Sequence, residues 1–257
     1  MSFTLDKKSR LPATPITDAE QSLRIDLAAA YRLVAYRCWD DLIYTHITAR
    51  LPGPEECFLI NPFGLRFDEI TADNLVKIDR FGRIYGDAPH EVSAIGFRIH
   101  ATVHRARPDV CCVMHLHDVN GIAVSAQRDG LLPLSQHAIR FYGQIGYHEY
   151  EGLALTEKEG ERLVASLSQH SAMFLRNHGT LVCGRTVAEA YVLMDTLNKA
   201  CAIQLMAQAG GVPLVMPPVD VLETTARQLV GDDVPEGERE WPALIRMLDG
   251  IDPSYRN

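Results

Sequence analysis

The stretch CCVMHLHDVNG, residues 111–121, places two histidines one residue apart at the end of an apolar run. Alternate side chains of a β-strand lie on the same face, so His115 and His117 would project together, about 7 Å apart along the strand. Two imidazoles at this spacing can bind one cation, but a strand that leaves the core also places polar residues there. The pair alone leaves a metal site and an ordinary strand end equally open.

A third histidine changes that balance. His178 lies in LRNHGTLV between apolar strand residues, and Gly179 after it lets backbone and ligand come close. A lone histidine in this setting is more often a hydrogen-bonded core residue. Three histidines that each end an apolar strand of one domain predict three protein ligands and an open position for substrate or water. We expect a divalent metal, with zinc favoured and manganese or iron as alternatives.

The other histidines give weaker signals. His100 and His104 are four residues apart on an expected helix, where the amphipathic pattern favours surface or interface positions over a metal pair. His46, His137 and His148 have no partner in the sequence. We expect each of them to be hydrogen-bonded rather than catalytic, unless the fold brings it to the metal.

Apolar periodicity and turn residues predict the elements that must position these histidines. Helices are expected over residues 18–38, around 71–75 (TADNL), and over 90–107, 122–126, 158–169, 186–209 and 238–252. Strands are expected within 44–51, 57–64, 75–79, 110–117 and 143–150, and as two pieces of 171–184 around a tight turn at His178 and Gly179. The helix over 186–209 has the clearest ends, with Thr186 as N-cap, Glu189 as its capping-box partner and two glycines after it.

Composition limits the classes of protein to be considered. The 257 residues contain no Ser/Gly-rich or Pro-rich linker, which favours one α/β domain. A net charge of -8 without a Lys/Arg cluster argues against nucleic acid, so a small molecule or another copy of the chain is the expected partner. No apolar run reaches the roughly 20 residues of a membrane span, and the N-terminus lacks the features of a secretory signal, which together predict a cytoplasmic protein. The 6 cysteines form no CxxC pair and are expected to be reduced core thiols.

Several segments together resemble the class II aldolase/adducin family, over about residues 20–210. They are YTHITAR, FLINPFGLRFDEIT, LVKID, RPDVCCVMHLH, GLLPLS, GYHEYEG and LRNHGTLVCGRTVAEAY, and in detail they are closer to the adducin-head-like branch than to the sugar-phosphate aldolases. The resemblance implies a three-layer α/β/α fold on a largely antiparallel central sheet, assembled as a homotetramer with active sites at the subunit interfaces. It implies a family domain over 20–211, between an N-terminal arm (1–19) and a C-terminal extension (212–257). It also implies that His115, His117 and His178 are the metal ligands.

The chain departs from the aldolases of that family at several site positions. Their catalytic glutamate ends an SSE motif before the two histidines, and the matching stretch here is AIG, so Gly96 stands where the glutamate is expected. Their phosphate-binding GN falls on Thr45 and His46, and the threonine of their PTG falls on Phe63. An aromatic ring cannot donate a hydrogen bond to phosphate, so a phosphorylated sugar is a poor substrate candidate.

These observations predict a metal-dependent lyase, of aldolase or decarboxylase type, for an unphosphorylated hydroxy- or keto-carbonyl compound cleaved through a metal-stabilised enolate. The candidate proton carriers are, in falling order, His137, His46, Tyr142 and Glu91. The candidate substrate-binding residues are Asn61, Phe63 and Gly64. Two alternatives remain open: a non-catalytic, self-associating module like the adducin head, which the missing glutamate favours, and an iron-dependent, oxygen-using relative.

Overall fold

The computed structural model describes residues 10–53, 56–87, 89–152, 157–230 and 236–257. Within these ranges, nine strands form one sheet in the order β1-β5-β4-β3-β2-β6-β9-β8-β7. The pairs β1–β5 and β7–β8 are parallel, and the other neighbours are antiparallel. The prediction of a largely antiparallel sheet is therefore confirmed.

The elements follow the predicted pattern with local differences. The strands are β1 (Arg10–Leu11), β2 (His46–Arg50), β3 (Cys57–Ile60), β4 (Val76–Asp79), β5 (Ile84–Tyr85), β6 (Cys112–Leu116), β7 (Ile145–His148), β8 (Ala172–Leu175) and β9 (Gly179–Gly184). The helices are α1 (Asp18–Tyr36), η1 (Phe67–Glu69), α2 (Ala94–Ala106), α3 (Val119–Ser125), α4 (Gln136–Ile139), α5 (Glu157–Leu167), α6 (Val187–Ala209), α7 (Val219–Val230), α8 (Trp241–Ile251) and η2 (Pro253–Arg256).

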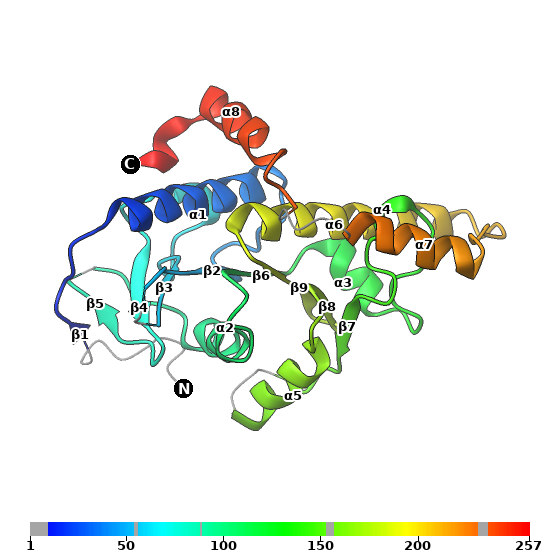
Figure 1. The fold of residues 1–257 in the computed structure, drawn as a ribbon, viewed down its shortest axis with the longest axis horizontal. Helices are drawn as coiled ribbons and strands as arrows, with labels where there is room; N and C mark the ends of the chain where they lie inside the picture. The colour runs from blue at the N-terminus through cyan, green and yellow to red at the C-terminus, as the bar shows by residue number, and fades with distance from the viewer. Residues whose placement is uncertain (1–9, 54–55, 88, 153–156, 231–235) are drawn as a thin grey trace.

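Helices cover both faces of the sheet and give the three layers that were predicted. The long helices α1 and α6 lie along one face, with α8 outside them, whereas α2 and α5 lie on the other (Figure 1). The central strand β6 shows how the layers form: Met114 packs in the core with α1 and α6, while Val113 packs in a separate core with α2 and α5. Because side chains alternate along a strand, His115 shares the face of Val113.

Helix α1 fixes strand β2, which pairs with the strand of His115, and the end of β3. Thr17 caps its first turn by accepting a hydrogen bond from the backbone N–H of Glu20 at 3.2 Å. Further along, the fully buried Tyr31 hydroxyl donates to the carbonyl of Ile47 at 2.5 Å and accepts from the backbone N–H groups of Ile47 and Asn61 at 2.7 and 3.2 Å. One hydroxyl thus joins α1 to β2 and to the end of β3.

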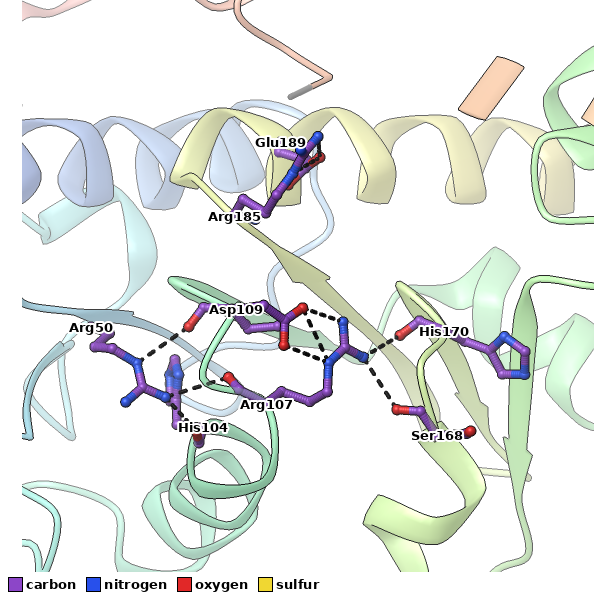
Figure 2. Close-up of polar contacts among 9 residues, drawn as sticks. Arg50, His104, Arg107, Asp109, Ser168, His170, Arg185 and Glu189 are labelled. Atoms are coloured by element: carbon purple, nitrogen blue, oxygen red, sulfur yellow. Dashed lines mark hydrogen bonds and ion pairs between the residues drawn. The ribbon is translucent and has the colours of Figure 1, made fainter. Parts of the chain in front are cut away.

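Two arginines shape the connection from α2 into β6. Arg107 donates hydrogen bonds from Nε and Nη2 to the carboxylate of Asp109 (Figure 2). Its third guanidinium nitrogen, Nη1, donates to the carbonyls of Ser168 and His170, at 3.2 and 3.1 Å. Arg50 of β2 donates to the carbonyl of His104, which lies in the last turn of α2 and has no partner within the helix. These contacts hold the chain immediately before the strand that carries His115.

Helices at the C-terminal end pack on α1 and α4. Trp241, at the start of α8, packs on Tyr191 and donates its ring N–H to Asp26 of α1 at 2.9 Å. The backbone N–H of Ala72 donates to the carbonyl of Tyr255 at 2.9 Å. The predicted final helix is confirmed, whereas α7 was not predicted. None of the helices in the described ranges combines the length and the apolar character that a bilayer crossing requires.

Three local predictions need correction. No helix forms at TADNL, because the Asn74 side chain accepts from the backbone N–H of Thr71 at 3.0 Å and holds a turn. Helix α2 starts only after Ser93, whose hydroxyl caps it. Thr186 caps α6 as predicted, but the Glu189 carboxylate accepts from the backbone N–H of Arg185 instead of from Thr186. All six cysteines are free thiols, but Cys38 is exposed and Cys111 is only partly buried, so the prediction that they lie in the core is wrong for these two.

Replacing Tyr31 with phenylalanine is expected to destabilise the fold by about 1–3 kcal/mol, because it leaves buried backbone groups of Ile47 and Asn61 without their partner. Urea unfolding followed by circular dichroism measures this change. Tyr36→Phe, at a position 53% exposed on the same helix, is the matched control and should leave the midpoint unchanged. Equal stability of the two variants would contradict the assigned role of the Tyr31 hydroxyl.

Candidate metal centre

The structure brings the three predicted histidines together. His115 is in β6, His117 follows the end of that strand, and His178 lies in the turn between β8 and β9. One ring nitrogen from each lies within 4.8 Å of the others, and the Nε2 atoms of His117 and His178 are 3.0 Å apart. Two nitrogens bound to one zinc ion in tetrahedral geometry would be about 3.3 Å apart. The arrangement is therefore close to that of a three-histidine metal site.

Strand pairing and one tight turn cause this convergence. Strands β6 and β9 pair with His115 opposite Leu181, which places the start of β9 beside the end of β6. Asn177 has φ 57°, a left-handed conformation that asparagine tolerates. It turns the chain so that His178 lies beside His115 and His117. A Cβ on Gly179 would lie 2.4 Å from the carbonyl oxygen of Leu116. Only glycine allows the two strands to approach so closely.

Hydrogen bonds set the tautomers of two of the rings. His115 Nδ1 lies 2.9 Å from the carbonyl oxygen of Thr180, and His117 Nδ1 lies 2.9 Å from a carboxylate oxygen of Asp41. Both oxygens accept, so each Nδ1 carries the proton and each Nε2 keeps the lone pair that binds a metal. Burial is the main cause that lowers the pKa of His178 to about 4 and that of His115 well below its ordinary value. Both rings are thus in the neutral, metal-binding form.

A buried carboxylate supports the strand that holds His115. Asp118 is 2% exposed and accepts from the Thr180 hydroxyl at 2.9 Å, from the Asn198 amide at 2.7 Å and from the backbone N–H of Gly121 at 2.6 Å. Thr180 in turn presents its carbonyl oxygen to His115. The sequence analysis missed both Asp41 and Asp118. Asp118 directly follows the pair His115 and His117, so its position could have indicated a supporting role. Asp41 is far from both histidines in the sequence, and no local pattern connects it to them.

His46 occupies the space beside Gly96. It lies opposite His115 across the β2–β6 pair, with the ring centroids 5.6 Å apart. It is buried, and its Nε2 has no hydrogen-bond partner among the described residues. A Cβ on Gly96 would lie 2.5–2.7 Å from three atoms of the His46 ring. A side chain at position 96 and the imidazole in this orientation therefore exclude each other.

The expected surface or interface positions of His100 and His104 are wrong, because both rings are buried on the side of α2 that faces the sheet. Thr48 of β2 supplies the polar partner that permits this burial. Its hydroxyl lies 2.7 Å from His100 Nδ1 and 2.8 Å from His104 Nε2. The same two histidines are absent from the metal-binding group of the described residues.

The remaining candidates lie at varied places, and their roles stay predictions. His137 is exposed on α4, and Tyr142 packs against the cluster that α4 forms with α7. Glu91 forms a bridge with Phe63, whose backbone N–H donates to the Glu91 carbonyl at 2.8 Å. Asn61 is buried, and its amide oxygen lies 2.9 Å from the Tyr31 hydroxyl. Gly64, in the turn after Phe63, has φ 102°, which favours glycine.

The sheet, its helices and the histidine cluster define a class of protein with known members. The family model described as "Class II Aldolase and Adducin N-terminal domain" matches residues 25–205, and the chain belongs to the class II aldolase/adducin family. A solved structure of an aldolase II superfamily protein from Pseudomonas syringae superposes with a TM-score of 0.91 at 49% identity, over 94% of this chain and 98% of that one.

Two further relatives are an aldolase and an adducin, the two kinds of protein that the family description names. L-fuculose 1-phosphate aldolase from Glaciozyma antarctica superposes with a TM-score of 0.82 at 27% identity, over 95% of this chain and 97% of that one. Rat α-adducin is 39% identical over 247 residues, which cover 90% of this chain and 34% of the adducin. The chain is therefore similar both to an enzyme and to one third of a much longer protein.

Replacing His115 with alanine is expected to abolish metal binding, because it removes one of the three nitrogens that converge. Metal content after loading with zinc and gel filtration should fall from about one ion per chain to background. His170→Ala, outside the cluster, is the control and should retain the ion. A His115→Ala protein that keeps its full metal content would contradict the site.

Removing the Thr180 hydroxyl is expected to weaken metal binding without removing a ligand. In Thr180→Val the hydrogen bond from residue 180 to Asp118 is lost. The backbone carbonyl of residue 180, which accepts from His115, is then held less firmly. Loss of such an outer contact typically costs about tenfold or more in metal affinity. Thr180→Ser, which keeps the hydroxyl, should bind zinc like the wild type in a chelator competition. Equal affinities for the valine and serine variants would show that Asp118 does not support the centre.

Proposed function

We propose that this protein is a divalent-metal-dependent carbon–carbon lyase, of aldolase or decarboxylase type, that acts on an unphosphorylated hydroxy- or keto-carbonyl compound. The observation that carries the proposal is the convergence of His115, His117 and His178, two of them with Nε2 left as the ligand atom by their hydrogen bonds. Zinc is the favoured ion for three neutral imidazoles, with manganese and iron as alternatives. Membership of a family that includes aldolases supports the same reaction class.

The three histidines would hold the ion and leave at least one position open for substrate. A divalent cation there would polarise a carbonyl oxygen and stabilise the enolate that remains when a carbon–carbon bond breaks. Asp41 and Thr180 keep the rings of His117 and His115 in the ligand tautomer throughout. Asn61, Phe63 and Gly64 are the proposed substrate-binding residues, and Phe63 offers no hydrogen-bond donor to a phosphate in its side chain.

His46 is the proton carrier that the geometry supports best. Its ring lies next to His115 and beside Gly96, and its Nε2 has no partner among the described residues. Burial, followed by the nearby His117, lowers the pKa of His46 to about 3, so the resting ring is neutral. At this pKa the ring is a weak base, and it holds a proton only when negative charge on the bound substrate raises its pKa. In cleavage, it would take the proton of the substrate hydroxyl whose carbon becomes a carbonyl. It would then return that proton to the carbon left negative by the broken bond.

The proposed subunit assembly determines whether the other candidate proton carriers can reach a metal centre. We propose a cytoplasmic homotetramer with active sites at the subunit interfaces, as the resemblance implies. In such an assembly, a residue without a contact to the centre of its own chain can face the centre of a neighbour. His137, which is exposed on α4, and Tyr142 and Glu91 remain candidates on that basis.

A non-catalytic, self-associating module is the second candidate, and two observations favour it. The chain is 39% identical to α-adducin, and Gly96 stands where the aldolases of the family have their catalytic glutamate. The two proposals differ in turnover, because a scaffold needs the fold but not a proton carrier. An iron-dependent reaction with oxygen is the third alternative, and it differs from the lyase in its need for oxygen.

A turnover screen separates these functions. Protein loaded with Zn²⁺, Mn²⁺ or Fe²⁺ is incubated with unphosphorylated hydroxy-keto acids, once without and once with oxygen, and carbonyl products are measured by chromatography. The lyase should give products, and His46→Gln should lower kcat by about 10²–10⁴ at unchanged metal content, the usual contribution of a general acid or base. His170→Gln serves as the control. Absence of products from every loaded form would favour the scaffold, and products only with oxygen and iron would favour the oxygen-using relative.

A further inference from the structure

The ring of His46, the proposed proton carrier, has three close neighbours. The ring of His115 lies across the β2–β6 pair, with the two centroids 5.6 Å apart. The backbone of Gly96 is so close that a Cβ there would lie 2.5 Å from the Cε1 atom of His46. The ring of His100 has its centroid 4.2 Å from that of His46, with the two planes at 45°. Of the two ring contacts, the one with His100 is therefore the tighter.

A single hydroxyl group fixes the ring of His100. The buried Thr48 has its Oγ1 atom 2.7 Å from His100 Nδ1 and 2.8 Å from His104 Nε2. Burial holds the pKa of His100 well below its ordinary value and lowers that of His104 to about 3, so both rings are neutral. A hydroxyl has one proton to donate, so at least one of the two nitrogens donates to the oxygen instead. Thr48 thus fixes the two rings together.

The residues that hold His46 come from two elements that face each other. Thr48 and His46 are two residues apart on β2, so their side chains share one face of the sheet. His100 and Gly96 are four residues apart on α2, so they share one face of the helix. The hydrogen bond between Thr48 and His100 therefore joins α2 to β2 directly beside the ring of His46.

His104 provides a comparison within the same structure. It is as deeply buried as His100 and binds the same hydroxyl. Its ring packs on Phe58, with the centroids 4.7 Å apart, and makes no ring contact with His46 among the described residues. A property that depends on His100 but not on His104 must therefore come from the contact between His100 and His46.

An alternative is that the backbone alone holds His46. Burial is the largest influence on the pKa of His46 and lowers it, whereas hydrogen bonds with the backbone of Gly96 and Thr45 raise it. A hydrogen bond restrains one nitrogen of the imidazole. The torsion about the Cβ–Cγ bond of a histidine has a broad range, and packing against a neighbouring ring narrows it. The two kinds of contact therefore restrict different motions of the ring.

We propose that His100 is a positioning residue, whose ring, held by Thr48, keeps the imidazole of His46 in its place beside Gly96 and His115. The inference rests on the proposed function, because His100 acts on the reaction only through the proton carrier His46. It assigns a role to a buried histidine that is not one of the three metal ligands.

Crystal structures of the zinc-loaded variants measure the place of the His46 ring without any substrate. His100→Asn keeps an amide group near the position of Nδ1, where it can bond to Thr48, and removes the part of the ring beyond it. In this variant the His46 ring should turn away from Gly96 or occupy more than one orientation. His100→Phe keeps a ring against His46, and His104→Gln keeps a partner for Thr48, so both should leave the His46 ring in place.

A second variant and one clear outcome keep this test decisive. His100→Ala, which removes the ring altogether, should displace His46 in the same way and replaces His100→Asn if that protein does not fold. A His46 ring that stays beside Gly96 in His100→Asn and in His100→Ala would show that the backbone alone holds it, and would overturn the proposal.

Exchange of a carbon-bound proton of dihydroxyacetone with D₂O measures the proton transfer itself. The C–H bond next to the carbonyl breaks, its electron pair stays on the substrate as the enolate, and the proton passes to His46. A deuteron from the solvent then takes its place on the carbon. His100→Asn should lower kcat for exchange about ten- to hundredfold at unchanged KM and zinc content, because a misplacement of about 1 Å can cost about 10²-fold.

The other variants separate positioning from a general effect on the fold. His100→Phe should restore most of the exchange rate, and His104→Gln should match the wild type. An equal loss of kcat in His104→Gln and His100→Asn would overturn the positioning role. Absence of exchange in the wild type with Zn²⁺, Mn²⁺ or Fe²⁺ would count against the proposed lyase, and the crystal structures would then decide alone whether His100 positions His46.

Discussion

The register of β6 between β2 and β9 is the constraint on which the rest of the site depends. In this register His115 faces the layer of α2 and α5, opposite His46 on one side and Leu181 on the other. A shift by one residue would turn Met114 or Leu116 toward the site and His115 into the core of α1 and α6. The apolar residues of β6, which pack in both cores, hold the strand in the register that brings the three histidines together.

The polar groups around the centre are positioned by parts of the chain that are distant in sequence. Asp41 precedes β2 and bonds to His117. Asp118 caps α3 and accepts from Thr180 of β9 and from Asn198 of α6. The buried rings of His100 and His104 are held by Thr48, on the same strand as His46. The centre is therefore built on strands at the middle of the sheet, where the surrounding packing leaves little freedom of movement.

Gly96 and His46 determine which polar group lies beside His115. Gly96 of α2 has no side chain, and the ring of His46 from β2 fills the space that a Cβ at position 96 would need. The polar group next to His115 across the β2–β6 pair is therefore an imidazole. The proposed replacement of the aldolases' catalytic glutamate by Gly96 is compatible with altered chemistry or with a scaffold, and turnover separates the two.

Much of the fold and the convergence of the three histidines could be predicted from the sequence, because both follow from short local patterns of residues. The spacing of His115 and His117 and the glycine after His178 indicated the centre without any tertiary information. Other features depend on contacts that no local pattern records. The burial of His100 and His104 requires Thr48 on another element, and α7 follows a Pro-rich stretch that hides its helical start.

X-ray absorption at the zinc edge tests the central claim most directly, since it measures the atoms around the ion in the loaded protein. The account predicts three imidazole nitrogens at about 2.0–2.1 Å, completed by oxygen from water or an added hydroxamate. A first shell of sulfur, or of oxygen without the scattering pattern of imidazole rings, would contradict it.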